Sequence, residues 1–358
     1  MKLLFIVSNL RRTGPTNQLF YIIKNLSEEF QATVLTLSPE PQDSELKKFL
    51  DANISVDSLS LSRLKGFVKG KSLLKSYIDN FKPDIIQTQG IRADGLLASL
   101  STNAPWITTS RNFPKEDYPT KFGFAKGKFM AIKHEHYLSS CPNLISCSHY
   151  IHDCLSSVNI ESKVIQNGTL PSTNQSTKAV DKEHLNIISV GSLIPRKNMT
   201  EVLAISSSLT DLGVSHSLKI LGDGPQMEEL KLAANDNVEF LGNINNVREH
   251  LSQADVFIST SLSEGLPNTV LEALAEGVNL ILSEIPSHEE IVEKLDHSHY
   301  FIIPKERALE EYIQDVVTSL DSMSFDVPHV KNFLEMEFSD RKMSINYQDL
   351  YRELVYGK

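Results

Sequence analysis

The sequence has little cysteine, and its three cysteines form no recognisable pattern. Cys141, Cys147 and Cys154 lack the Cys-x-x-Cys spacing of zinc and redox motifs. Free thiols are typical of a reducing compartment, so a cytoplasmic protein is expected. The sequence also lacks any apolar run near ~20 residues, which argues against a spanning helix. Polar residues end the apolar stretch Met1–Val7 early, and this predicts a first strand rather than a signal peptide.

Charge is unevenly distributed along the chain. The 358 residues carry 35 Lys and Arg against 45 Asp and Glu. Residues 1–170 hold 20 of these cations and 15 of the carboxylates, so the first half is basic and the second strongly acidic. The length fits two domains better than one core. The net negative charge and the lack of a recognisable motif argue against nucleic-acid binding, whereas the basic half suits an anionic lipid surface.

Strand and helix patterns alternate through the chain. Lys2–Ser8 and Ala32–Leu37 read as strands around a helix, Gln18–Leu26, and a glycine loop at Gly14. No G-x-G-x-x-G occurs there, so support for dinucleotide binding is weak. A polar stretch at 169–184 predicts a linker, and a second series of strands and helices begins at Leu185. The pattern predicts α/β architecture with two Rossmann-like, doubly wound parallel-sheet domains facing a cleft, at residues 1–170 and 171–337.

Two segments of the first half combine cations with apolar residues. The predicted helix Ser62–Phe81 carries five cations, among them Arg63 and Lys65, and the segment Lys115–Lys133 mixes aromatics with lysines. Either could lie on an anionic membrane, or the second could contact an acceptor. For the helix, a solvated lysine-rich face packed on its own sheet remains the alternative. Near the C-terminus, Val330–Tyr356 reads as one long helix.

Three loops in the second half follow predicted strands, where parallel sheets bind ligands. The loop Gly191–Asn198 brings Arg196 and Lys197, cations that can neutralise a diphosphate. The loop Ser263–Asn268 brings Glu264 and leads into a helix whose free N–H groups suit phosphate. Glu272 follows about one turn into that helix. Carboxylates beside an anion site predict a ligand with hydroxyls next to phosphates, such as a nucleotide-sugar; solvated surface loops are the alternative.

Four motifs follow one another in this half of the chain. They are Val190-Gly191-Ser192-Leu193 with Arg196-Lys197-Asn198, then Leu221-Gly222-Asp223-Gly224-Pro225, then Phe240-Leu241-Gly242, and finally Ser263-Glu264-Gly265-Leu266-Pro267 with Glu272-Ala273. In these residues, and in this order, the chain resembles the retaining glycosyltransferases of family four, which have the GT-B fold. The end of the first domain, Val164–Gly168, is also similar to that family.

The resemblance implies a role for each motif residue. It implies a donor site that needs no metal and no cofactor besides the nucleoside diphosphate-sugar co-substrate, and a same-face reaction in which the leaving phosphate helps to deprotonate the acceptor. It also implies that a C-terminal helix, about 338–358, packs back on the first domain. By this resemblance Arg196 and Lys197 hold the diphosphate, and Glu264 binds the sugar hydroxyls. The backbone amides of Gly265 and Leu266 contact sugar and phosphate, Glu272 binds the ribose, and Gly242 and Asn243 bind the base. Gly14 allows the first loop to approach the donor closely.

The chain also departs from the family pattern. Ser192 stands where the family often has arginine, which leaves the phosphate to Arg196 and Lys197. Many members end the strand equivalent to Ile107–Ser110 in a histidine near the reacting sugar, and here Arg111 follows that strand. We therefore regard Arg111, His134 and His136 as candidate catalytic residues beside Glu264. The alternative for the two histidines, which is favoured, is that they are surface residues of a helix.

The predicted function is transfer of a hexose or N-acetylhexosamine from a UDP- or GDP-sugar. The acceptor would be a saccharide or a lipid-linked saccharide, in surface polysaccharide biosynthesis such as capsule, O-antigen or lipopolysaccharide. The basic first half favours a cytoplasmic enzyme located peripherally at the inner face of the membrane. Two alternatives stay open: a nucleotide-sugar 2-epimerase of the same fold, and a non-catalytic nucleotide-sugar-binding module. Donor turnover without acceptor would favour the epimerase.

Overall fold

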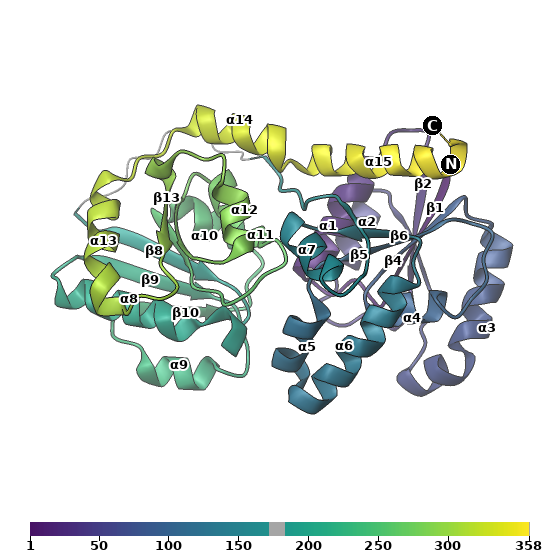
Figure 1. Ribbon diagram of the computed structural model, residues 1–358, viewed down its shortest axis with the longest axis horizontal. Helices are drawn as coiled ribbons and strands as arrows, with labels where there is room; N and C mark the ends of the chain where they lie inside the picture. Colours follow the sequence, from purple (N-terminus) through teal and green to yellow (C-terminus); the bar gives the residue numbers. More distant parts are fainter. Residues whose placement is uncertain (172–182, 358) are drawn as a thin grey trace. The chain divides into compact units, whose positions relative to one another are not determined.

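The computed structural model describes residues 1–171 and 183–357, without the side chains of residues 63–65 and 67. Most of the predicted linker and the side chains of Arg63, Lys65 and Phe67 therefore lie outside the described residues. The chain divides into two compact units (Figure 1). Unit 1 comprises Met1–Gly168 together with Asp340–Lys358, and unit 2 comprises Thr169–Ser339.

Unit 1 is built on a seven-stranded sheet in the order β3-β2-β1-β4-β5-β6-β7, with every neighbouring pair parallel. The inner strands are buried along most of their length, as expected of a parallel sheet covered by helices. In chain order its elements are β1 Lys2–Val7, α1 Gly14–Lys24, β2 Gln31–Thr36, α2 Leu46–Asp51, β3 Ser55–Ser58, α3 Arg63–Phe81, β4 Ile85–Gln89, α4 Ile91–Leu97, β5 Trp106–Ser110, α5 Pro114–Phe122, α6 Phe124–Ser139, β6 Asn143–Ser146, α7 His149–Ser156, β7 Lys163–Val164 and, from the C-terminus, α15 Asp340–Tyr356.

Helix α15 belongs to unit 1 although it is more than 170 residues away in sequence. Ser344 Oγ donates to the carbonyl of Ile22 in α1 at 2.8 Å. Two buried tyrosines reach the sheet: Tyr351 donates to Gln87 Oε1 at 2.6 Å, and the hydroxyls of Tyr347 and Thr109 are 2.9 Å apart. These contacts fix the last helix on the first unit.

Unit 2 is built on a six-stranded parallel sheet in the order β10-β9-β8-β11-β12-β13. Its core joins the apolar residues of β8, β9, β11 and β12 to α8 and α13. In chain order its elements are β8 Leu185–Val190, the 3₁₀ turn η1 Pro195–Lys197, α8 Met199–Asp211, β9 His216–Leu221, α9 Met227–Ala233, β10 Val238–Gly242, α10 Val247–Gln253, β11 Val256–Ser259, α11 Asn268–Ala275, β12 Asn279–Ser283, α12 Pro286–Val292, η2 His297–His299, β13 Tyr300–Ile303, α13 Leu309–Ser322 and α14 Val327–Glu337.

The predicted fold class is confirmed, because each unit is an α/β Rossmann-like unit on a parallel sheet (Figure 1). The expectation of one helix over Val330–Tyr356 was wrong, since α14 ends at Glu337 and α15 begins at Asp340. The backbone of Phe338 leaves the helical region with φ −131°, and its carbonyl accepts from Thr169 N at 2.7 Å. The hydrogen bond from Thr169 thus replaces the one that the Phe338 carbonyl would accept within a continuous helix.

Candidate functional site

Backbone hydrogen bonds join the three glycine-containing loops of unit 2 at the carboxyl ends of neighbouring strands. Gly191 N donates to the carbonyl of Leu221 at 2.9 Å, and Leu193 N donates to that of Asp223 at 3.0 Å. Gly222 N donates to the carbonyl of Gly242 at 2.8 Å. The loops that follow β8, β9 and β10 therefore form one continuous edge, where open parallel sheets bind ligands.

Gly222 is required at this edge by both conformation and space. Its φ is +138°, in a region that L-residues avoid. A Cβ built there would lie 1.9 Å from the carbonyl oxygen of Gly191. Gly224 is equally restricted, because its Cβ would lie 2.3 Å from the carbonyl oxygen of Leu193. The two glycines let the loop after β9 lie directly against the loop after β8.

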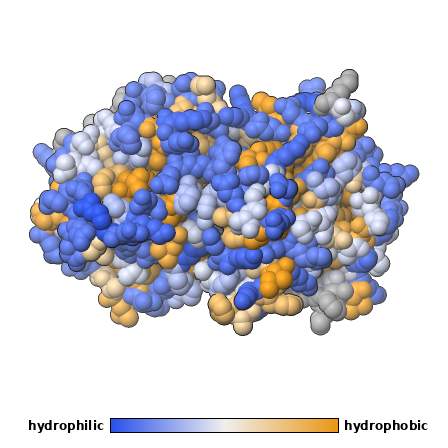
Figure 2. Space-filling view, viewed as in Figure 1, coloured by the Kyte–Doolittle hydropathy of each residue, from blue (hydrophilic) through white to orange (hydrophobic). Residues whose placement is uncertain are grey.

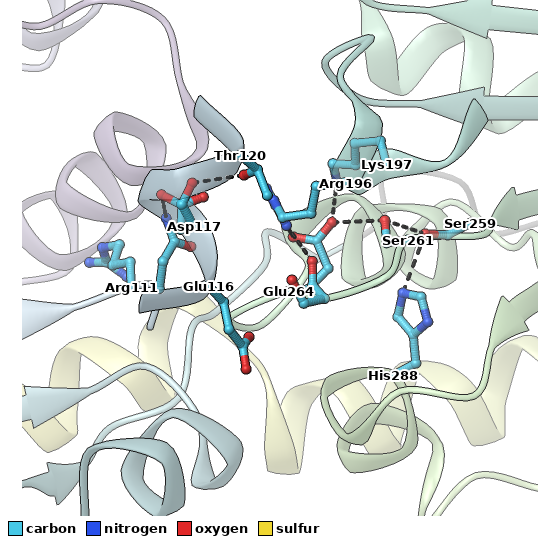
Figure 3. Close-up of polar contacts among 12 residues, drawn as sticks. Arg111, Glu116, Asp117, Thr120, Arg196, Lys197, Ser259, Ser261, Glu264 and His288 are labelled. Atoms are coloured by element: carbon cyan, nitrogen blue, oxygen red, sulfur yellow. Dashed lines mark hydrogen bonds and ion pairs between the residues drawn. The ribbon is translucent and has the colours of Figure 1, made fainter. Parts of the chain in front are cut away.

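The loop after β8 is also tied to the loop after β11, its neighbour on the other side. Leu262 N donates to the carbonyl of Arg196 at 2.8 Å. Thr260 Oγ1 donates to the carbonyl of Asn198 at 2.8 Å. Asn198 adopts the left-handed conformation, φ 49° and ψ 43°, which ends η1 and starts α8. This geometry turns the side chains of Arg196 and Lys197 toward the loop after β11 (Figure 3).

Arg196, Lys197 and Glu264 form a buried ion-pair cluster (Figure 3). Arg196 Nη1 lies 2.8 Å from Glu264 Oε2, and Lys197 Nζ lies 2.5 Å from Oε1. Only 11%, 13% and 8% of the three side chains are exposed, in that order. Arg196 Nη1 also donates to the carbonyl of Ser263. Two cations share one carboxylate, so the cluster retains positive charge for an anionic ligand.

Glu264 is held ionised by this environment. Burial by itself would raise the pKa of the carboxyl group, but the charges of Lys197 and Arg196 and their hydrogen bonds lower it from 4.5 to about 2. A carboxylate in this state is an acceptor only. At neutral pH Glu264 can therefore accept hydrogen bonds from hydroxyl groups of a ligand.

A row of polar side chains continues from Glu264 into the core of unit 2 (Figure 3). Ser261 Oγ donates to Glu264 Oε1 at 2.9 Å and lies 3.4 Å from Ser259 Oγ, which is 3.3 Å from His288 Nε2. His288 Nδ1 donates to the carbonyl of Ser283 at 2.8 Å, which leaves Nε2 to accept. Burial lowers the pKa of His288 from 6.5 to about 4, so the ring is neutral.

Sequence reasoning did not identify this row, because its members come from β11, β12 and α12 and match no motif. The only signal in the sequence is the repeated serine at 259, 261 and 263, which is common in loops. The sheet brings the three elements together.

The other predicted donor-binding residues of unit 2 surround the start of α11 and the end of β10. Gly265 and Leu266 are buried directly before α11, which begins at Asn268 after Pro267. Glu272 is partly exposed within the helix. Gly242 ends β10 with φ +67°, and Asn243 follows it with an exposed side chain.

In unit 1, Arg111 stands at the carboxyl end of β5. Its Nε donates to Gln89 Oε1 at 3.2 Å and its Nη1 donates to Asn167 Oδ1. Both partners are neutral amides, and within the described residues Nη2 is buried without a hydrogen-bond partner. Gly14 is the first residue of α1, whose N-cap Thr13 accepts from Thr16 N at 3.4 Å.

The two candidate histidines have different surroundings. His134 is buried, with Nε2 2.9 Å from Asp94 Oδ2 and Nδ1 2.7 Å from the hydroxyl of Tyr118. Asp94 in turn accepts from Thr88 and Thr108, each at 2.6 Å. His134 thus joins α6 to α5, α4 and the sheet, whereas His136 is exposed. A catalytic role for Arg111 or for either histidine stays a prediction.

The described residues contain neither a candidate membrane span nor a candidate metal-binding cluster. Within residues 1–171 and 183–357, no helix is both long and apolar enough to span a bilayer. In the same residues, no group of three or more His, Cys, Asp or Glu side chains is arranged to hold a metal ion.

Comparisons with known proteins agree with the fold. Residues 172–323 match the family described as Glycosyl transferases group 1. The O-antigen biosynthesis glycosyltransferase WclY of Escherichia coli is 23% identical over 375 residues, which cover 99% of each chain. Among solved structures, sucrose-phosphate synthase from Thermosynechococcus elongatus aligns with a TM-score of 0.80 at 16% identity over 100% of both chains. HepE of Anabaena, solved in complex with UDP-glucose, aligns with a TM-score of 0.78 at 16% identity, over 99% of this chain and 100% of HepE. The two structural likenesses show a shared fold.

Proposed function

We propose that this chain transfers a sugar from a nucleoside diphosphate donor to an acceptor, with retention of configuration; the match of residues 172–323 to the family Glycosyl transferases group 1 supports this proposal. The observation that carries the proposal is the buried cluster of Arg196, Lys197 and Glu264 at the carboxyl edge of the unit 2 sheet. It combines cations for phosphates with an ionised carboxylate for hydroxyls, which are the two kinds of group that a nucleotide-sugar presents.

The donor diphosphate binds against Arg196, Lys197 and the first turn of α11. The helix contributes free N–H groups and the positive end of its dipole, beside the amides of Gly265 and Leu266. Glu264 binds hydroxyls of the donor sugar, Glu272 binds the ribose, and the backbone at Gly242 and Asn243 binds the base. UDP- and GDP-sugars carrying a hexose or an N-acetylhexosamine have this layout.

Charge stabilisation at the leaving group drives the reaction in this proposal. As the bond between sugar and phosphate breaks, negative charge develops on the diphosphate beside Arg196 and Lys197. Preorganised cations in a buried site stabilise such charge strongly. They do so without a metal ion, and the departing phosphate takes the acceptor proton on the same face, so that no protein nucleophile is required.

The acceptor in this proposal is a saccharide or a lipid-linked saccharide of a surface polysaccharide. WclY, which aligns over nearly the whole chain, is named for O-antigen biosynthesis. We place the enzyme on the cytoplasmic side, with its acceptor presented at the inner membrane surface, since residues 1–170 carry a net positive charge.

A panel of nucleotide-sugars tests the proposal. A donor at 100 times its Kd stabilises the folded protein by about 2.7 kcal/mol, which a thermal-shift assay detects. The stabilising donor is then incubated with saccharide acceptors, and NMR reads the anomeric configuration of the product. Retained configuration is expected. No shift with any nucleoside diphosphate-sugar would overturn the donor site. Conversion of the donor sugar without acceptor would overturn transfer in favour of epimerisation.

A further inference from the structure

Hydrophilic and hydrophobic surfaces alternate over the face of unit 1 that Figure 2 shows. Hydropathy on this face therefore gives little guidance to a ligand subsite. Such a subsite is better sought among single polar side chains whose charge or hydrogen bonds are not balanced within the protein. Arg111, directly after β5, is such a residue.

The guanidinium of Arg111 has only neutral partners within the described residues. Its Nε donates to Gln89 Oε1 at 3.2 Å, and its Nη1 donates to Asn167 Oδ1. Nη2 is shielded from solvent and, in the same part of the chain, has no hydrogen-bond partner. A cation shielded from water is costly unless a counter-charge or a full set of hydrogen bonds compensates it. The folded chain supplies Arg111 with neither.

Other arginines of limited exposure in this protein do have a counter-charge. Three of them contact a carboxylate within 4 Å: Arg12 contacts Glu45, Arg196 contacts Glu264, and Arg248 contacts Glu276. The fold therefore pairs its enclosed arginines in general, and the lack of a carboxylate at Arg111 is specific to this position.

The acidic residues that follow Arg111 most closely in sequence are engaged elsewhere. Glu116 accepts from the hydroxyl of Tyr150 at 3.0 Å, and Asp117 Oδ2 lies 2.7 Å from Lys121 Nζ. Figure 3 draws Arg111, Glu116 and Asp117, and no dashed line joins the arginine to either carboxylate. The charge of Arg111 is thus left for a ligand.

The poorly satisfied part of the guanidinium is one whole edge. Nε–H and the Nη2 group point to the same side of the planar fork, where a carboxylate can accept two parallel hydrogen bonds. On this edge, within the described residues, a single bond to Gln89 is made, and its 3.2 Å is at the long end for N–H···O. Charge-assisted bonds are about twice as strong as neutral ones, so a carboxylate can displace the Gln89 amide.

The opposite edge of the guanidinium is fixed from the core of unit 1. Asn167, which accepts from Nη1, is 3% exposed. Two hydrogen bonds hold the next residue: Gln18 Nε2 donates to the carbonyl of Gly168 at 2.8 Å, and Gly168 N donates to Gln18 Oε1 at 3.0 Å. The guanidinium is therefore oriented in advance, which lowers the entropic cost of binding.

Open space adjoins the residue that covers this edge. Gln89 is partly exposed and ends β4, and Gly90 follows it with φ +91°. A Cβ built on Gly90 would meet no atom within 4 Å. Strand β4 lies beside β1, where the strand order of the sheet reverses. Open parallel sheets bind ligands outside the carboxyl ends of their strands at this point.

We propose that Arg111 binds a carboxylate of the acceptor, so that the acceptor is a saccharide ending in an acidic sugar of the uronic acid class. The carboxylate accepts from Nε and Nη2 and takes the place of the Gln89 amide oxygen. The subsite rests on the sugar transfer proposed above, to which it adds selection of the acceptor by charge.

The amount of charge favours a carboxylate over a phosphate group. The neighbouring cations Lys115 and Lys121 are paired with Glu135 and Asp117. Arg111 therefore offers a single positive charge, which matches the one negative charge of a carboxylate. A phosphate monoester carries close to two negative charges at neutral pH and would leave one of them uncompensated.

Two sugars that differ only at C6 test the subsite in the whole protein. Methyl β-D-glucuronide carries a carboxylate where methyl β-D-glucoside carries a hydroxymethyl group. Ligand-observed NMR titration measures the Kd of each without any donor. The glucuronide is expected to bind about ten- to a hundred-fold more tightly, which is the range that a hydrogen bond to a charged group provides.

Variants of Arg111 separate charge from shape. Arg111→Gln should abolish the preference for the glucuronide but leave stabilisation by a nucleotide-sugar unchanged, because the cation cluster of the donor site belongs to unit 2. Arg111→Lys keeps the charge without the two-bond fork and should retain part of the preference. Arg352→Gln is the matched control: this unit 1 cation contacts Glu29 and Asp349, and its removal should leave both Kd values unchanged.

Transfer assays add a kinetic criterion. With a stabilising donor and the two sugars as acceptors, Arg111→Gln should raise the KM for the glucuronide about ten-fold or more and change kcat little. An equal fall in kcat with both sugars would overturn the subsite, because Arg111 would then act at the reacting atoms.

Two binding results would also overturn the subsite. The first is equal binding of glucuronide and glucoside by the parent protein, even if a nucleotide-sugar stabilises it. The second is tighter binding of methyl β-D-glucoside 6-phosphate than of the glucuronide, which would assign Arg111 to a phosphate. If no nucleotide-sugar stabilised the protein, the proposed transfer would fail, whereas the donor-free titration would still decide whether Arg111 binds a carboxylate.

Discussion

Neutralising Glu264 is expected to destabilise unit 2. The carboxylate is 8% exposed and lies between Arg196 and Lys197 at 2.8 and 2.5 Å. Its pKa falls from 4.5 to about 2 in the folded protein. At 1.36 kcal/mol per pKa unit, ionisation in the folded state contributes about 3 kcal/mol to the free energy of unfolding at pH 7. Glu264→Gln keeps the shape of the side chain and should lose a similar amount, because it removes the negative charge that the buried Arg196 and Lys197 share.

The effect has a defined pH range. A depressed carboxyl pKa stabilises the fold fully above the unfolded value of 4.5, and this stabilisation is lost as the pH falls toward about 2. Chemical denaturation followed by circular dichroism measures the free energy of unfolding at each pH. The difference between the parent protein and Glu264→Gln should be largest at neutral pH and shrink in acid.

Ligand binding should change in the opposite direction to stability. In the ligand-free protein the carboxylate of Glu264 occupies the cations that we assign to the donor diphosphate. Removing its charge should strengthen the binding of inorganic pyrophosphate, measured by calorimetry. Sugar transfer should nevertheless fall by about a hundred-fold, because a hydrogen bond from the sugar to a charged group, worth roughly 1.5–3 kcal/mol, is lost.

Glu276 provides the matched control. It is a buried carboxylate of the same unit, 5% exposed in its side chain and paired with Arg248. Glu276→Gln should lower stability without strengthening pyrophosphate binding. The reasoning is refuted if Glu264→Gln unfolds at the same denaturant concentration as the parent protein at pH 7, or if both variants bind pyrophosphate equally.

Two further predictions concern the support of this cluster. Gly222→Ala should destabilise the protein by about 2 kcal/mol or more, since its Cβ would lie 1.9 Å from the carbonyl oxygen of Gly191. Gly213 also has a positive φ but lies in open space, so Gly213→Ala should destabilise the protein by only about 1 kcal/mol. Equal unfolding midpoints for the two variants would contradict this prediction. Burial lowers the pKa of His288 from 6.5 to about 4. Because the unfolded chain binds the proton more readily, the free energy of unfolding should decrease by about 3 kcal/mol as the pH falls through that range. His288→Asn should flatten this part of the stability curve, and the exposed His297→Asn should leave it unchanged.

Local sequence was sufficient to predict the fold class and the loops at the carboxyl edge of the unit 2 sheet. Parallel strands such as Val256–Ser259 are short apolar runs, and glycine or proline turns separate them from amphipathic helices, so hydrophobic periodicity reveals them. The same periodicity missed α5 and α6. Pro119 lies inside α5, and α6 exposes aromatic rings on its outer face, so neither has the usual apolar stripe.

The sequence by itself determined that Arg196, Lys197 and Glu264 follow strands of one parallel sheet, because residue types and turn spacing are local properties. Only the tertiary structure decided that one carboxylate binds both cations and that a serine row ends at His288, because the strand order β8-β11-β12 brings together loops more than 60 residues apart. It likewise decided that His134 is buried against Asp94 while His136 is exposed. Both lie on one helix two residues apart, and packing against α4 selects which of them is enclosed.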